Sequence, residues 1–300
     1  MSFVFGAGYT NCDLLYSGLP ALPAEGTELY AKHFVIQIGG GPPATLINLK
    51  KLGVPTKLAT FLGDSLFCGL VKSEYARHNM DYVNLYHGNG TPITITTAMI
   101  TPDDRTFVSY REDTSLSEAV VDQMAEASLG AGFAIMDPQF LELHKRQKAA
   151  GTTLIFDMGW EENLSLKSYA DYLTLADYYT PNQKEALQMT GTTRVDDAID
   201  VLSNYFSQAL IKLDKDGCLI KENGVKTVIP PMQNIVAVDS TGAGDAFLAG
   251  FLYGLYHEYD FADCVRFGNI TGGICVEAIG CLGKQINETE LLELRRKYYG

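Results

Sequence analysis

The sequence predicts an α/β fold in which a mostly parallel central sheet is flanked by helices and carries a small projecting sheet. Short apolar runs alternate with mixed polar and apolar segments at helical spacing, which is the pattern of parallel strands joined by helices. Two threonine-rich stretches interrupt this alternation. The 300 residues are 46% apolar, so we expect one domain with a large core over residues 1–300.

Apolar runs and helical spacing locate the expected elements in chain order. Strands are expected at residues 3–8, 56–62, 133–136, 153–156, 178–180 and 209–213. Helices are expected at residues 44–52, 117–127, 140–150 and 184–189. The first helix follows three glycines and two prolines and stops at Gly53, which agrees with proline at helix starts and glycine past helix ends.

The threonine-rich stretches predict a lid. Residues 91–100 and 106–111 flank a turn that contains Pro102 and two aspartates, and this arrangement is typical of a hairpin. Residues 28–38 are also β-prone. We expect these segments, within about 13–38 and 91–112, to pair into a projecting sheet that excludes water from a site.

Composition argues against several classes of partner. The 23 basic and 36 acidic residues give a net charge of −13 without a basic patch, so neither nucleic acid nor a membrane surface is an expected partner. The start of the chain lacks the pattern of a signal peptide, and no apolar run reaches the length of a membrane span. The six cysteines lack C-x-x-C or zinc-finger spacing, and we expect a cytoplasmic protein with reduced thiols.

The most informative string runs from Asp239 to Phe247 and precedes an apolar helix; a strand at residues 235–238 is expected to lead into it. Small residues at a helix start leave amides free to bind a phosphoryl group. Asp245 in that first turn is placed to take a proton from an attacking hydroxyl. The alternative is an aspartate that only complements the helix dipole.

This string resembles the C-terminal signature D-T-x-G-A-G-D of the ribokinase or PfkB-type carbohydrate kinase family. The resemblance implies a ribokinase-like fold and assigns Asp245 as the catalytic base. It further implies that Gly242, Ala243 and Gly244 form the anion hole, and that Asp239 lies near a monovalent cation such as K⁺.

Matching segments on the substrate side lie near the N-terminus. Asn11 and Asp13 match the family's N-x-D, whose aspartate binds substrate hydroxyls, and Gly40 and Gly41 match its glycine signature, where the backbone closes over the sugar. A loop or helix-capping aspartate is the alternative for Asp13. Ala44 stands where many members have a substrate-binding asparagine, which leaves the sugar specificity open.

Matching segments on the nucleotide side lie in the C-terminal half. Asn182 and Glu185 resemble the family's N-x-x-E, which organises Mg²⁺ through water, although the same spacing suits an ordinary capping box. The segment after the strand at 209–213 resembles the turn that borders ATP, with Asp214 in place of a glycine. The expected ATP-binding residues are Asn182, Lys212, Asp214, Gly217 and Asn269.

Arg111 ends the predicted hairpin in a Tyr-Arg pair, a position that contacts the substrate in family members acting on acidic sugars. Its planar fork suits a carboxylate. An exposed arginine at the end of a strand is the alternative.

These observations predict a kinase that transfers the γ-phosphoryl group of ATP, with Mg²⁺, to a hydroxyl of a sugar or sugar derivative, and we expect this hydroxyl to be primary. Two alternatives remain open: a nucleoside kinase of the same fold, and a carbohydrate-binding regulator without catalysis. By resemblance, a homodimer through the lid is a further expectation.

Overall fold

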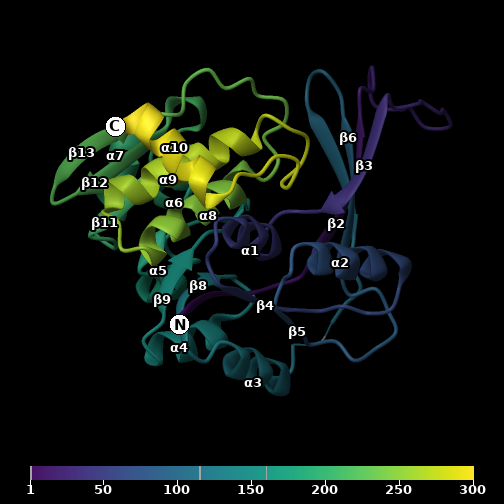
Figure 1. The fold of residues 1–300 in the computed structure, drawn as a ribbon, viewed down its shortest axis with the longest axis horizontal. Coiled ribbons are helices and arrows are strands. Elements are labelled where there is room, and N and C mark those ends of the chain that lie inside the picture. The colour runs from purple at the N-terminus through teal and green to yellow at the C-terminus, as the bar shows by residue number, and fades with distance from the viewer. Residues whose placement is uncertain (1, 115, 160) are drawn as a thin grey trace.

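The computed structural model describes residues 2–114, 116–159 and 161–300. Six parallel strands form the central sheet in the order β10-β9-β8-β1-β4-β5 (Figure 1). Beyond β10 lies an antiparallel sheet, β11-β12-β13, joined through a parallel bridge between Asn182 and Lys212. The strands are β1 Phe3–Ala7, β4 Thr56–Thr60, β5 Tyr82–Asn84, β8 Ala131–Met136, β9 Thr153–Phe156, β10 Tyr178–Tyr179, β11 Gln208–Lys212, β12 Cys218–Glu222 and β13 Val225–Ile229.

Helices pack on both faces of the central sheet. They are α1 Pro42–Lys51, α2 Leu66–Arg77, α3 Glu118–Ala127, α4 Leu141–Ala149, α5 Ala170–Leu175, α6 Gln183–Thr190, α7 Val195–Leu202, α8 Ala243–Tyr256, α9 Phe261–Cys275 and α10 Glu288–Tyr299. Within the described ranges, none of them combines the length and hydropathy needed to cross a membrane.

Alternating strand residues supply two separate hydrophobic clusters. Val4 of β1 joins the cluster that contains residues of α1, α8 and α9, whereas its neighbour Phe5 joins the cluster that contains residues of α3, α4 and α7. Leu58 and Ala59 of β4 divide in the same way. Successive side chains of a strand point to opposite faces, so the sheet is buried on both sides, as the apolar runs predict.

The predicted α/β fold class is confirmed, and one predicted strand is wrong. Residues 235–238 form no strand; Val236 is exposed, and the amide nitrogens of Val238 and Asp239 donate to the carbonyl oxygen of Val276 at 2.7 and 3.2 Å. The segment is β-prone, but its backbone bonds go to the end of α9 rather than to a strand. Only His33–Ile38 of the predicted stretch 28–38 is a strand.

A second sheet projects from the central one and is called here the projecting sheet (Figure 1). Its order is β3-β2-β6-β7, formed by His33–Ile38, Asn11–Ser17, Thr94–Ile100 and Arg105–Tyr110. Paired residues share a face, so the register defines two faces. The inner face carries Asp13, Gln37, Arg105 and Phe107, and the outer face carries Tyr16, Phe34, Ile36, Val108 and Tyr110.

Candidate active site

Asp245 lies in the first turn of α8. The helix is preceded by its N-cap Gly242, which has a φ of 77°. A Cβ atom on Gly242 would come within 2.1 Å of the Cβ atom of Cys281, so the turn requires glycine. The Ala243 amide donates a long bond of 3.3 Å to the Ser240 carbonyl, while Gly244 belongs to the first turn, whose amides lack an intrahelical partner.

The glycine segment before α1 contacts the carboxylate of Asp245. Its Oδ1 atom accepts a hydrogen bond of 2.9 Å from the amide of Gly41, the N-cap of α1. A Cβ atom on Gly40 would lie 2.6 Å from Oδ2. The N-termini of α1 and α8 therefore converge on one carboxylate, and the close approach depends on a residue without a side chain.

The protein environment makes Asp245 a stronger base than an ordinary aspartate. Burial is the largest cause and, with the negative charge of Asp157, raises the pKa of Asp245 to about 7. The Gly41 amide and the Lys212 ammonium act in the opposite direction. A carboxyl group with this pKa is able to accept a proton near neutral pH.

Asp13 approaches the same glycine segment from the projecting sheet. Asn11 begins β2, and its carbonyl accepts a bond of 2.8 Å from the Gly39 amide. The Asp13 carboxylate lies so close that a Cβ atom on Gly39 would be 2.4 Å from Oδ2. Burial raises the pKa of Asp13 to about 6. The sequence-predicted Asp13 and Asp245 thus flank neighbouring glycines.

Lys212, at the end of β11, forms an ion pair with Asp157, and both charges act on Asp245. Its Nζ atom lies 3.1 Å from Oδ1 of Asp157, and both side chains are largely buried. Burial alone would lower the pKa of Lys212, but Asp157 and Glu185 outweigh it, so the pKa is raised and the ammonium stays charged. A Cβ atom on Gly244 would lie 3.6 Å from this ammonium, which places a positive charge beside the α8 N-terminus.

Asn182 and Glu185 form the capping box at the start of α6. The Asn182 Oδ1 atom accepts from the Glu185 amide, and the Glu185 Oε2 atom accepts from the Asn182 amide, both at 2.9 Å. Glu185 is buried, which raises its pKa, whereas Lys212 opposes the rise. The pair is therefore a cap, and its carboxylate also lies in the electrostatic field of the Lys212 ammonium.

The turn after β11 lies further out. Asp214 has a φ of 52° and an exposed side chain, so its charge faces solvent. Gly217 has a φ of 88°, and its Cβ atom would lie 2.2 Å from the Ile229 carbonyl oxygen. Asn269 of α9 donates to that same oxygen at 3.3 Å. The predicted ATP-side residues Gly217 and Asn269 thus meet at the end of β13.

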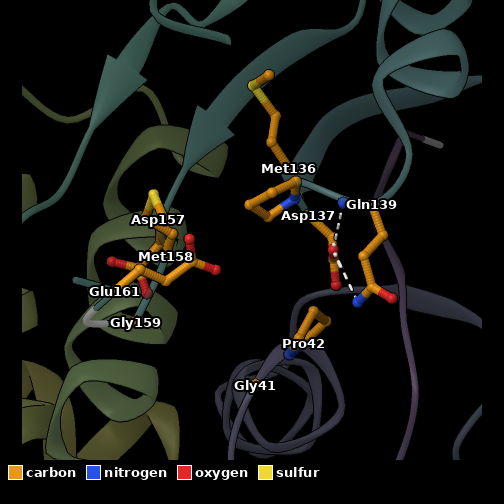
Figure 2. Close-up of a pocket in the computed structure, with 10 residues that line it drawn as sticks. Gly41, Pro42, Met136, Asp137, Gln139, Asp157, Met158, Gly159 and Glu161 are labelled. Carbon is orange, nitrogen blue, oxygen red and sulfur yellow. Dashed lines mark hydrogen bonds between the residues drawn. The ribbon is translucent and has the colours of Figure 1, made fainter. Parts of the chain in front are cut away.

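A cavity of about 280 Å³ opens between the carboxyl ends of β8 and β9, with the start of α1 on a third side (Figure 2). Three carboxylates, those of Asp137, Asp157 and Glu161, belong to its lining residues. Asp137 accepts from the Gln139 amide at 2.8 Å, and burial raises its pKa. Arg111, which has an exposed side chain, lies 4.0 Å from the Tyr9 ring centre, and its charge opposes the rise at Asp137.

Asp239 organises the loop before α8. Its Oδ1 atom accepts from the Thr241 amide at 3.0 Å and from the Thr241 hydroxyl at 2.8 Å. Its Oδ2 atom accepts from the Gly280 amide at 2.8 Å. The Arg105 guanidinium, which comes from the hairpin of the projecting sheet, lies 3.2 Å from Oδ1 of Asp239 and forms an ion pair with it.

Sequence reasoning missed Asp137, Asp157 and Arg105. The two aspartates directly follow strands that were expected at 133–136 and 153–156, and ligands of parallel sheets bind outside the carboxyl ends of strands. That rule was sufficient to find them. Arg105 carries no such signal, because its role depends on how far the folded hairpin reaches.

Comparison with known proteins gives consistent matches over nearly the whole chain. The model of the pfkB family of carbohydrate kinases matches residues 2–287. Ribokinase of Haemophilus influenzae is 24% identical over 300 residues, which cover 95% of this chain and 96% of that protein. The structure of Arabidopsis thaliana ribokinase complexed with ribose and ATP superposes with a TM-score of 0.81 at 21% identity, covering 98% of this chain and 99% of that one. The structure of Burkholderia thailandensis nucleoside kinase in complex with inosine superposes with a TM-score of 0.80 at 18% identity, covering 99% of both chains.

Proposed function

Because the chain belongs to the pfkB family of carbohydrate kinases, we propose that Asp245 is the general base of an ATP-dependent phosphoryl transfer to a hydroxyl of a sugar or sugar derivative. Family membership places the chain among the kinases of sugar-like substrates. The observation that carries the assignment is the half-buried Asp245 carboxylate, which lies in the first turn of α8 and accepts a hydrogen bond from the Gly41 amide.

In this mechanism the acceptor hydroxyl, which we take to be primary, lies beside Asp245 and is oriented by Asp13, Asn11 and the backbone at Gly40. Asp245 removes the hydroxyl proton as the oxygen bonds to the γ-phosphorus of ATP, and the bond from this phosphorus to the bridging oxygen breaks to release ADP. The amides of residues 242–244 and the Lys212 ammonium face the charge that develops on the phosphoryl oxygens.

The residues of the site fit Mg²⁺ held mainly by nucleotide phosphates. In the described part of the chain, no group of three or more His, Cys, Asp or Glu side chains could hold a metal. Mg²⁺ commonly takes one or two carboxylates, with water and phosphates completing its shell. Glu185 and Asp157 would hold it, in part through water, and bound Mg²⁺ neutralises phosphate charge. We place the nucleotide along Asn182, Lys212, the turn at Asp214 and Gly217, and Asn269.

The acceptor site offers carboxylates as partners for hydroxyl groups. Asp13 and Asp137 lie on the substrate side, and Phe107 of the inner face supplies an aromatic surface that suits either a sugar ring or a base. The ribose and inosine complexes of the structural neighbours support both classes. Thermal-shift screening of sugars, sugar acids and nucleosides with an ATP analogue separates them, because a bound ligand stabilises the native state.

Arg111 is proposed to bind an anionic substituent. If the acceptor is a sugar acid, Arg111→Ala should raise KM for it and leave the KM of a neutral sugar unchanged. Equal effects on both would contradict the assignment.

We also propose that the outer face of the projecting sheet pairs two copies of the chain. This face exposes large apolar side chains, with Phe34 49%, Val108 63% and Tyr110 60% accessible. Contiguous apolar surface of this kind indicates an interaction site.

The six unpaired, buried cysteines support a reducing compartment such as the cytoplasm.

The test of the proposed base is Asp245→Asn. The substitution keeps the side-chain volume and removes proton acceptance, so kcat should fall by roughly 10²–10⁴-fold while circular dichroism shows an intact fold. Asp122→Asn is the matched control, because Asp122 is an exposed aspartate on α3 that pairs with Arg146. If Asp245→Asn retains the turnover of the control variant, Asp245 is not the base.

A further inference from the structure

We infer that the Arg105 guanidinium takes the place of the monovalent cation expected beside Asp239. It also connects the projecting sheet to the loop of residues 239–242 that precedes α8, which is called here the anion-hole loop. The inference rests on the proposed function, because it names the group that positions this loop during phosphoryl transfer. Arg105 is a positioning residue, since its contacts are to protein atoms.

The surroundings of Asp239 do not fit a free cation. Oδ1 already accepts from three donors, namely the Thr241 amide, the Thr241 hydroxyl and the Arg105 guanidinium. Oδ2 accepts from the Gly280 amide. A carboxylate has about four acceptor positions. The four donors match this number, so an alkali cation would have to displace one of them or share the single negative charge with the guanidinium, which repels it.

The guanidinium also contacts two residues of the turn before α8, Asp239 and Thr241. The same Nη1 atom that contacts Asp239 lies 2.7 Å from the Thr241 hydroxyl. Thr241 directly precedes Gly242, the N-cap of α8. Asp239 is 8% and Arg105 33% exposed, so the pair is partly shielded from solvent and from salt screening.

A second contact joins the same two parts of the molecule. Gln37 of the inner face donates from Nε2 to the Ile279 carbonyl at 3.3 Å. Its amide lies against Gly280, where a Cβ atom would overlap the Gln37 side chain. Gly280 in turn donates to Asp239. The sheet therefore contacts both loops that surround this carboxylate, and Arg105 supplies the charged contact.

Two consequences distinguish this arrangement from a cation site. The positive charge is covalently part of the chain, so activity does not require K⁺. The charge sits on the projecting sheet, so movement of the hairpin away from α8 would remove a partner of Asp239 and Thr241 at the same time. The anion hole is then fully ordered only when the hairpin is in place.

The test compares wild type, Arg105→Ala, Arg105→Lys and the control Arg194→Ala, in KCl and in choline chloride of equal concentration. Arg194 is an exposed arginine that pairs with acids on α7. We expect wild type and control to turn over equally in both salts. Arg105→Ala should lose kcat by on the order of tenfold to a hundredfold, as expected for a misplaced catalytic loop, with partial recovery in KCl. Arg105→Lys, which keeps a point charge, should fall between the two.

Melting temperatures of the same variants, measured without substrate, give a readout that does not depend on activity. KCl should raise the melting temperature of Arg105→Ala relative to choline chloride and leave wild type unchanged. A wild-type enzyme that needs KCl, or an Arg105→Ala variant that matches the control in both salts, would overturn the inference. Absence of phosphorylation with every substrate would instead remove the proposed function, while the melting comparison would still decide whether Arg105 replaces the cation.

Discussion

The proposed chemistry of the site depends on the surroundings of one carboxyl group, that of Asp245. Its pKa of about 7 results from burial and the nearby Asp157, only partly offset by the Gly41 amide and Lys212. A base with a pKa near the working pH combines a useful ionised fraction with a strong pull on the proton. The same burial makes ionisation unfavourable for the folded state.

Activity should therefore follow the ionisation of Asp245. Because the base must be ionised, kcat/KM should fall about tenfold per pH unit below the pKa of about 7 and level off above it. A pH profile measured at subsaturating substrate checks this expectation. A profile that stays flat down to pH 5 would contradict it.

The effect of pH on the stability of the fold runs opposite to its effect on activity. The folded pKa of Asp245 is raised from 3.8 to about 7, so between these values the folded state binds more protons than the unfolded state. The contribution of this group to stability is then present at low pH and is lost as the pH rises through 7. Asp245→Asn, which cannot ionise, should be more resistant to urea than wild type at pH 8.

At the scale of elements, the capping box of α6 has two proposed roles, which are to cap the helix and to bind the nucleotide. A second capping box elsewhere in the chain allows the two roles to be measured separately. Asn287 and Glu290 form the same box at the start of α10. Asn182→Ala and Asn287→Ala should each lose about 1 kcal/mol of unfolding free energy. Only Asn182→Ala should also raise the KM for MgATP. Equal KM values in the two variants would leave Asn182 with the capping role alone.

The sequence anticipated the elements whose residues carry their own pattern. The apolar run at 153–156 became β9 without change, and the hairpin turn at Pro102 separates β6 from β7. The prediction of a strand at residues 235–238 was wrong, because a β-prone composition does not by itself provide a neighbouring strand to pair with. The aspartates after β8 and β9 were accessible to a positional rule, whereas the contact between Arg105 and Asp239 joins residues 134 positions apart and depends on tertiary geometry.

At the scale of the whole molecule, the outer face of the projecting sheet predicts association. Phe34→Glu combined with Val108→Glu should convert a dimer to a monomer, because two charges would be buried without partners. Sedimentation velocity measures the change. Val225→Glu is the matched control, since Val225 of β13 is 63% exposed, as is Val108. A wild-type monomer at micromolar concentration, or dissociation by the control, would contradict the proposed interface.

The hydrogen bond from Gly41 to Asp245 joins residues 204 positions apart. At roughly 5–20 residues per second, a ribosome needs about 10–40 s to add the intervening segment. During that interval the nascent polypeptide already contains its glycine segment and Asp13 but lacks Asp245, the proposed base. The two helix starts can therefore meet on this carboxylate only after most of the chain has been synthesised.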